Sequence, residues 1–180
     1  MKQLTADYPN QKIFVDVLGK LSVQSDEGHN FIFLVIDAKT KYVQAKALHQ
    51  IRGIDITNAL QVMYINLFSY PSQLISDNGL SSPEIRSFCS LNNIDLTFIS
   101  SYNPRSNGVA ERSIKTIKNI LYKLYHQEGE WSETSLSRIV FMYNCAIHGT
   151  TGFSPFFLFM GREPVLLAVS TMSQIPFTNM

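Results

Sequence analysis

The sequence lacks several features that would each indicate a particular class of protein. It has only two cysteines, Cys89 and Cys145, too few for a disulfide framework. Both lie in apolar helical patterns, so we expect them in the core of a protein from a reducing compartment. No apolar run is long enough to span a bilayer, since FIFLVI is short and FSPFFLFMGREPVLLAV is broken by charges and prolines. We therefore expect an intracellular protein with no signal peptide and no membrane partner.

Repeats, low-complexity segments and a strong net charge are also missing. The chain has 180 residues, 45% of them hydrophobic, and a formal net charge of +1. This composition provides enough apolar material for one sizeable core, so disorder is not expected. We divide the chain into an N-terminal extension over residues 1–10, a core domain over 11–165 and a tail over 166–180.

Strand and helix patterns alternate along the core domain. Apolar and β-branched runs predict strands, and recurring apolar residues at helical spacing predict helices. The expected strands lie at residues 12–21, where Gly19 closes the strand, twice within 31–48, at 73–76 and at 94–100. The expected helices lie at 55–68, within SSPEIRSFCSLNN (81–93) with Ser82 as its cap, from Glu111 to about 126, and at 132–146. This order predicts an α/β fold, a mixed five-stranded sheet with three antiparallel strands followed by parallel ones, covered by helices on both faces. The segment HGTTGFSPFFLFMGREP is expected to be loop-rich.

Three acidic residues occupy unusual places in this pattern. Asp16 interrupts an apolar strand, Asp77 ends a later strand, and Glu111 begins a helix. Each has a structural alternative: Asp16 could cap a strand end, Asp77 could belong to an Asp-Asn-Gly turn, and Glu111 could complement the helix dipole. Together they favour function, because neighbouring strands and the following helix could bring all three to one edge of the sheet. Three carboxylates suit two Mg²⁺ ions, which prefer oxygen ligands and can promote phosphoryl displacement.

The helix that begins at Glu111 carries a local excess of positive charge. Glu111, Lys115 and Lys118 follow at spacings that place them on one helix face, opposite an apolar stripe. Such a face could hold a phosphate backbone beside a metal site. The alternatives are a solvated helix surface and a simple Glu-to-Lys helix pair, which is worth only a few tenths of a kcal/mol.

Five motifs in order resemble the catalytic core of retroviral and gypsy-type retrotransposon integrases. They are FVDVLGKL, FIFLVIDAKTKYVQAKAL, LISDNG, YNPRSNGVAER and YNCAIHGTTGFSPFFLFMGREP, which together cover roughly residues 8–165. The resemblance implies an RNase H-like fold and a polynucleotidyl transferase that trims the ends of element DNA and joins them to target DNA.

The resemblance also implies roles for individual residues. Asp16, Asp77 and Glu111 would form the catalytic Asp-Asp-Glu triad and bind Mg²⁺ or Mn²⁺, with Asn78 beside the site. Four other residues would contact DNA: Tyr102, Asn107, Lys115 and Lys118. The implied partners are element and target DNA and further copies of the chain, in the nucleus.

The sequence departs from the family pattern in two respects. Thirty-three residues separate Asp77 from Glu111, two fewer than usual in the family, and the family's upstream zinc module and C-terminal DNA-binding domain are not found. These departures favour an alternative, a non-catalytic domain derived from a retroelement and retained for nucleic-acid or protein binding. A ribonuclease H proper is disfavoured, because such enzymes usually use four acidic residues.

Overall fold

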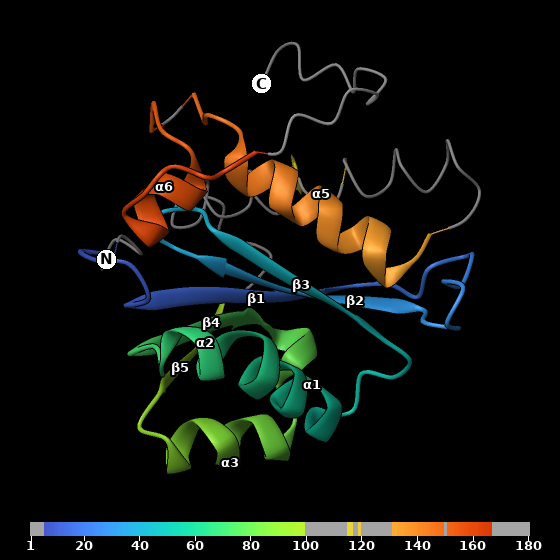
Figure 1. Cartoon of the computed structure of the whole chain (residues 1–180). Helices are drawn as coiled ribbons and strands as arrows, with labels where there is room; N and C mark the ends of the chain where they lie inside the picture. The colour runs from blue at the N-terminus through green and yellow to red at the C-terminus, as the bar shows by residue number, and fades with distance from the viewer. Residues whose placement is uncertain (1–5, 100–114, 117–118, 120–130, 150, 167–180) are drawn as a thin grey trace.

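The computed structural model describes residues 6–99, 115–116, 119, 131–149 and 151–166, which form a five-stranded sheet with helices on both faces (Figure 1). The strands lie in the order β3-β2-β1-β4-β5. Their bounds are β1 Lys12–Leu18, β2 Phe31–Asp37, β3 Val43–Leu48, β4 Gln73–Asp77 and β5 Asp95–Ile99. The helices are α1 Gly53–Leu60, α2 Asn66–Phe68, α3 Pro83–Leu91, α5 Glu133–Cys145 and α6 Pro155–Met160, with a π-helical turn at Gln61–Ile65 and a 3-10 turn at Asn78–Leu80.

The pairing of the strands confirms the predicted mixed sheet. β1 pairs antiparallel with β2, and β2 pairs antiparallel with β3. β4 then pairs parallel with β1, and β5 pairs parallel with β4. The chain thus begins with an antiparallel meander and adds two parallel strands on the other side of β1.

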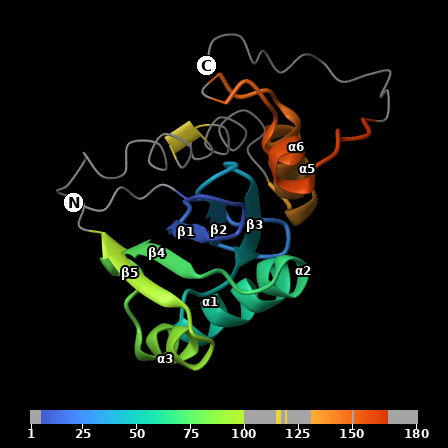
Figure 2. The same ribbon diagram turned by 90° about the vertical axis from the view of Figure 1, so that its left-hand side faces the viewer.

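The helices divide between the two faces of the sheet. α5 and α6 lie over one face, and α1, α2 and α3 lie over the other (Figures 1 and 2). β2 is buried at every position after its first, as expected for a strand covered on both sides. Each face has its own core: Trp131, Leu34 and Tyr143 belong to the α5 side, and Phe33 and Tyr64 to the α1 side.

The predicted helix 55–68 begins earlier than its pattern suggested and is not regular throughout. It begins at Gly53, because the Asp55 carboxylate accepts hydrogen bonds from the Arg52 backbone N–H (3.2 Å) and guanidinium Nε (2.8 Å). Asp55 therefore stabilises the first turn from within the helix. The π-helical turn then interrupts the segment, and local spacing gave no sign of it.

Strand β1 is shorter than the predicted segment 12–21 and ends at Leu18. At Gly19 the chain passes so close to Phe31 that an added Cβ would lie 2.5 Å from Phe31 Cδ1. Its φ of 139° also favours glycine. The segment therefore leaves the strand geometry one residue after Leu18.

The C-terminal part of the core contains a short helix where a loop was predicted. α6 begins after Ser154, whose side chain accepts a hydrogen bond from the Phe157 N–H, and Pro155 occupies its first turn. Ser followed by Pro is a recognised helix start, so the sequence carried the signal.

The prediction for the cysteines was only half right, since Cys89 is buried whereas Cys145 is partly exposed. Within the described residues, no helix combines the length and apolarity needed to cross a bilayer.

Candidate active site

Asp16 lies near the C-terminal end of β1 and is half-buried. Its carboxylate Oδ1 accepts a hydrogen bond of 2.8 Å from the Val17 backbone N–H. A partly solvated carboxylate in this position avoids the large penalty of a fully buried charge. The side chain therefore remains compatible with binding a cation at the sheet end.

Asp77 is the last residue of β4 and is exposed. Its Oδ1 accepts a hydrogen bond of 2.9 Å from the Gly79 backbone N–H, which caps the 3-10 turn that follows. No hydrogen bond from a described residue reaches the other oxygen, Oδ2. The turn therefore orients the carboxylate through one oxygen and leaves the second to an external ligand. Asp77 does form an Asp-Asn-Gly turn, as its structural alternative proposed, and this turn is compatible with a metal-binding role.

The register of β1 against β4 brings the two aspartates together. The paired residues run from Lys12 and Gln73 to Phe14 and Ile75. Continued by two residues, the same register sets Asp16 opposite Asp77, on strands about 4.8 Å apart. We call this end of the sheet the carboxylate edge, defined by Asp16 and Asp77.

Both aspartates also belong to the same face of the sheet. Phe14 and Leu18, two residues to either side of Asp16, pack in the core on the α5 side, and so does Ile75, two residues before Asp77. Because side chains alternate between faces along a strand, Asp16 and Asp77 lie on the α5 side as well. The two aspartates therefore lie on neighbouring strands and on the same face of the sheet.

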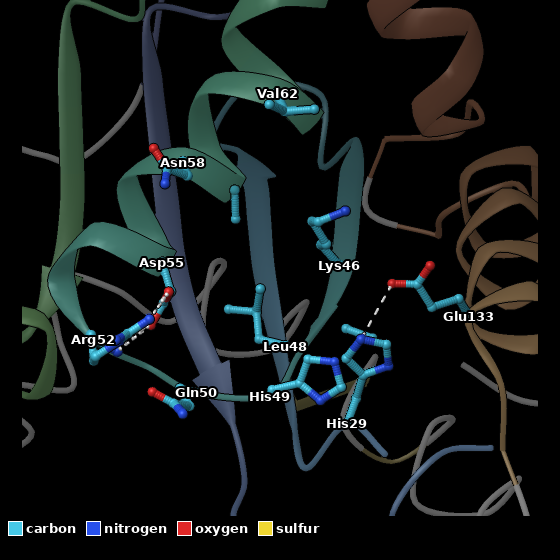
Figure 3. A pocket seen from close by; sticks show the side chains of 12 residues that line it. His29, Lys46, Leu48, His49, Gln50, Arg52, Asp55, Asn58, Val62 and Glu133 are labelled. Atoms are coloured by element: carbon cyan, nitrogen blue, oxygen red, sulfur yellow. Dashed lines mark hydrogen bonds and ion pairs between the residues drawn. The ribbon is translucent and has the colours of Figure 1, made fainter. Parts of the chain in front are cut away.

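A cleft beside β3 lies apart from the carboxylate edge (Figure 3). His29 and His49 stack there with ring centroids 4.1 Å apart, and His29 Nε2 lies 3.9 Å from a Glu133 carboxylate oxygen. Burial is the main cause that lowers the pKa of His29, and the neighbouring His49 lowers it further, whereas Glu133 and Glu27 oppose the shift. Neither Asp16 nor Asp77 lines this cleft, so the cleft is distinct from the predicted site.

Comparison with known proteins identifies relatives among retroelements. No protein-family model matches the chain. The Caenorhabditis elegans uncharacterized protein K02A2.6 is 30% identical over 158 residues, which cover 86% of this chain and 12% of that protein. The feline foamy virus Pro-Pol polyprotein is 32% identical over 121 residues (64% of this chain, 10% of that protein). The Schizosaccharomyces pombe transposon Tf2-3 polyprotein is 24% identical over 164 residues (89% and 12%).

Solved integrase structures share the fold. A simian T-cell lymphotropic virus intasome in complex with the PP2A regulatory subunit B56 gamma contains a chain that matches with a TM-score of 0.73 and 21% identity, covering 99% of this chain and 68% of that one. The HTLV-2 integrase catalytic core domain, in complex with magnesium in a trimeric form, matches with a TM-score of 0.65 and 19% identity, covering 88% and 99%. The chain is a relative of retroelement polyproteins with the fold of a retroviral integrase catalytic core. The predicted resemblance and the RNase H-like fold are thereby confirmed.

This chain spans only 10 to 12% of the length of the three relatives named above.

The described structure contains only part of the predicted site. Asp16 and Asp77 lie at the same end of two neighbouring strands, and Asn78 begins the 3-10 turn directly after Asp77. Lys115 is exposed in a helical segment. The remaining predicted residues, Tyr102, Asn107, Glu111 and Lys118, lie outside the described residues. The shortening before Glu111 is placed by sequence in NGLSSPEI (78–85), which the structure describes as the 3-10 turn Asn78–Leu80 followed by the start of α3.

The described residues alone do not complete a metal centre. Among them, no group of three or more His, Cys, Asp or Glu side chains is arranged to hold a metal ion. The carboxylate edge supplies two ligands, so the predicted triad depends on Glu111 for its third. The donor set nevertheless fits a hard divalent cation, because both described side chains offer carboxylate oxygen.

Proposed function

We propose that this integrase-type core is a divalent-metal-dependent polynucleotidyl transferase that processes DNA ends and joins DNA strands. The observation that carries the proposal is the parallel pairing of β1 with β4, whose register, continued two residues beyond Phe14 and Ile75, runs to Asp16 and Asp77. Two acidic side chains at the carboxyl ends of adjacent parallel strands form a favourable place for a ligand in an α/β fold. The relationship to retroelement polyproteins and the integrase fold support the same reaction class.

Asp16, Asp77 and Glu111 are the proposed ligands of Mg²⁺ or Mn²⁺, most simply two ions. When bound, such ions supply an activated oxygen nucleophile and stabilise the leaving oxygen. The chain itself provides orientation: the Gly79 N–H fixes Asp77 Oδ1, and the Val17 N–H contacts Asp16 Oδ1. These contacts hold the carboxylates in place before the substrate arrives, which reduces reorganisation during the reaction.

The proposed substrate is DNA, both as the end of an element and as the target of joining. A structural relative is an intasome and another is trimeric, which supports a homo-oligomeric assembly for this chain. Lys115 and Lys118 are proposed DNA contacts, together with Tyr102 and Asn107. Joining to chromosomal DNA would take place in the nucleus.

The proposal is tested by strand joining on a branched DNA substrate with the 180-residue chain. We expect joined product with Mg²⁺ or Mn²⁺ and none with a chelator. Asp77→Asn keeps the size of the side chain and an oxygen for the Gly79 N–H but removes the negative charge, so we expect product at background level. A wild-type chain with no more product than Asp77→Asn under either metal would contradict the catalytic function.

DNA binding measured on the same samples separates catalysis from the alternative role. If the wild type binds DNA but joins no strands, a non-catalytic nucleic-acid-binding domain is the better description. Glu111→Gln provides a matched test of the third proposed ligand, because it too removes only a charge. Activity in Glu111→Gln equal to the wild type would remove Glu111 from the proposed site.

A further inference from the structure

Arg86 in α3 is held in place at the carboxylate edge by two contacts. Its guanidinium Nε donates a hydrogen bond of 3.2 Å to the Ser81 backbone carbonyl. Its guanidinium carbon lies 4.7 Å from the centroid of the Phe98 ring. A stacked guanidinium with one N–H already bonded loses less conformational freedom when it binds a further group.

Both contacts place Arg86 near the end of β4. Ser81 follows directly after the 3-10 turn that Asp77 caps. Phe98 pairs with Ser76, and the next residue, Ile99, pairs with Asp77. Arg86 is therefore attached to the loop after Asp77 and to the strand beside it, on the α3 side of the same sheet end.

The remaining donors of Arg86 are available for an anion. An arginine side chain has five N–H donors, and only the Nε donor is used in the contact with Ser81. No described carboxylate forms an ion pair with Arg86, and no described residue accepts a hydrogen bond from its Nη1 or Nη2 atoms. The side chain is exposed, so these groups can contact a ligand in solution.

Charge indicates which ligand fits this position. The carboxylates of Asp16 and Asp77 repel the phosphates of a DNA strand that approaches the edge. A fixed arginine on the α3 side of the same sheet end offsets part of this repulsion and matches the geometry of a phosphate group. We propose that Arg86 binds a backbone phosphate and positions DNA at the carboxylate edge; this inference rests on the proposed function.

The experiment measures binding of the 180-residue chain to duplex DNA over a series of salt concentrations, with a chelator present to prevent reaction. Arg86→Gln keeps polar atoms but loses the charge, so we expect the slope of log affinity against log salt to decrease by about one unit. Arg86→Lys should retain the wild-type slope because it keeps the charge, with weaker binding because lysine lacks the planar fork. Phe98→Leu should likewise retain the slope and weaken binding, because the cation remains without its stacking partner.

Arg162→Gln is the matched control, since Arg162 is also exposed, its guanidinium carbon lies 5.0 Å from the Phe156 ring centroid, and it follows α6, which packs through Phe159 against Tyr42 at the other end of the sheet. A wild-type slope in Arg86→Gln would overturn the proposal, and so would an equal decrease in Arg162→Gln, which would indicate a general effect of net charge. A lower slope in Arg86→Lys would also contradict it, because the charge is kept. Thermal unfolding of each variant identifies any loss of binding that results from misfolding. If Arg86→Gln does not fold, the affinities of Arg86→Lys and Phe98→Leu decide, and wild-type affinity in both folded variants would overturn the proposal.

Strand joining on the same variants separates this inference from the proposed function. If Arg86 positions DNA, Arg86→Gln should raise KM more than it lowers kcat. If the wild type joins strands, Asp77→Asn does not, and Arg86→Gln matches the wild type in both slope and KM, the inference fails while the function stands. A wild type with neither metal-dependent joining nor DNA binding would refute both.

Discussion

The two ends of the sheet hold aspartates in opposite environments. At the carboxylate edge, Asp77 is exposed and accepts one hydrogen bond from a described residue, the Gly79 N–H. At the other end Asp37, the last residue of β2, is fully buried. It accepts hydrogen bonds from the backbone N–H groups of Asn10 (2.7 Å), Lys39 (3.2 Å) and Thr40 (2.7 Å), and from the Thr40 hydroxyl (2.7 Å).

This contrast shows how the fold separates a structural carboxylate from one that can act on a ligand. Asp37 is surrounded by donors and has no capacity left for an external group, so its role is to organise the turn between β2 and β3. We call residues 37–42 the buried turn. Asp77 has one fixed oxygen and a solvent-accessible position, which is the arrangement that a metal ligand requires. The predictions below test this contrast.

Asp77→Asn should have the largest effect, and that effect should be on activity alone. Strand joining should fall to background because the proposed metal ligand loses its charge. The free energy of unfolding should change by less than about 1 kcal/mol, because the residue is exposed and the amide oxygen still accepts from Gly79. Urea unfolding and the joining assay on the same preparation check both parts. A large loss of stability would mean that Asp77, like Asp37, is structural.

Asp37→Ala should have the opposite effect. Removing the carboxylate leaves several buried donors without an acceptor, and we expect the free energy of unfolding to fall by about 3–5 kcal/mol. Urea unfolding measures this loss. At low temperature, the strand-joining activity of the variant should be proportional to the fraction of the protein that is folded. Full stability in Asp37→Ala would show that the hydrogen bonds of the buried turn contribute little.

Asn144→Ala should cause a smaller loss of stability near the buried turn. The Asn144 side chain is buried and bonds to both the backbone N–H (2.9 Å) and C=O (2.8 Å) of Val43. It therefore acts as a partner for the edge strand β3, and its removal should destabilise the fold by about 2 kcal/mol. Thermal or urea unfolding tests this value. Asn144→Asp is the informative comparison, because a carboxylate can accept from the N–H but cannot donate to the carbonyl.

Lys115→Ala should affect DNA binding without a measurable effect on stability. Lys115 is exposed on a helical segment, so its loss should reduce the salt slope of DNA binding by about one unit if it contacts a phosphate. Lys118→Ala should behave in the same way. Lys39 lies in the buried turn, but its own side chain is exposed at the other end of the sheet. Lys39→Ala is therefore the control and should leave the slope unchanged. An unchanged slope in Lys115→Ala would mean that the lysine is merely solvated.

The smallest expected effect concerns the pH dependence of stability. Burial is the main cause that lowers the pKa of His148, the nearby Lys41 lowers it further, and a hydrogen bond to the Tyr143 backbone opposes the shift. Because the folded state binds a proton less readily than the unfolded state, His148 should lower stability as the pH falls below about 6.5. His148→Gln should therefore lose less stability than the wild type between neutral and mildly acidic pH. Urea unfolding at several pH values checks the difference, and parallel curves for the two proteins would contradict it.

Much of the fold could be predicted because its signals are local. The FIFLVID run indicated a strand buried on both sides, and Ser82 followed by Pro83 indicated the start of α3; the Ser82 side chain does accept a hydrogen bond from the Ile85 N–H. The errors arose where distant residues decide the geometry. Gly19 was recognisable as the residue that closes the first strand, and β1 does end directly before it, but its close approach to Phe31 could not be read from the sequence near Gly19.

The candidate site was predictable in its chemistry but not in its geometry. Asp16 interrupts an apolar strand and Asp77 ends one, so both were recognisable as unusual before the structure was known. Arg86 was not, because an arginine on a helix surface is ordinary. Its contacts with Ser81 and Phe98 come from two different elements and give it a position at the carboxylate edge.

The sequence by itself determined the order of the strands and helices, the family resemblance and the acidic residues available for chemistry, because these depend on residue type and short-range spacing. Only the tertiary structure decided which acids could act on a ligand. The parallel pairing of β1 with β4 brought the ends that carry Asp16 and Asp77 side by side, and the packing of the β2–β3 turn enclosed Asp37. The physical reason is that strand register and burial arise from contacts between residues far apart in the chain, so chemically identical side chains acquire two different environments.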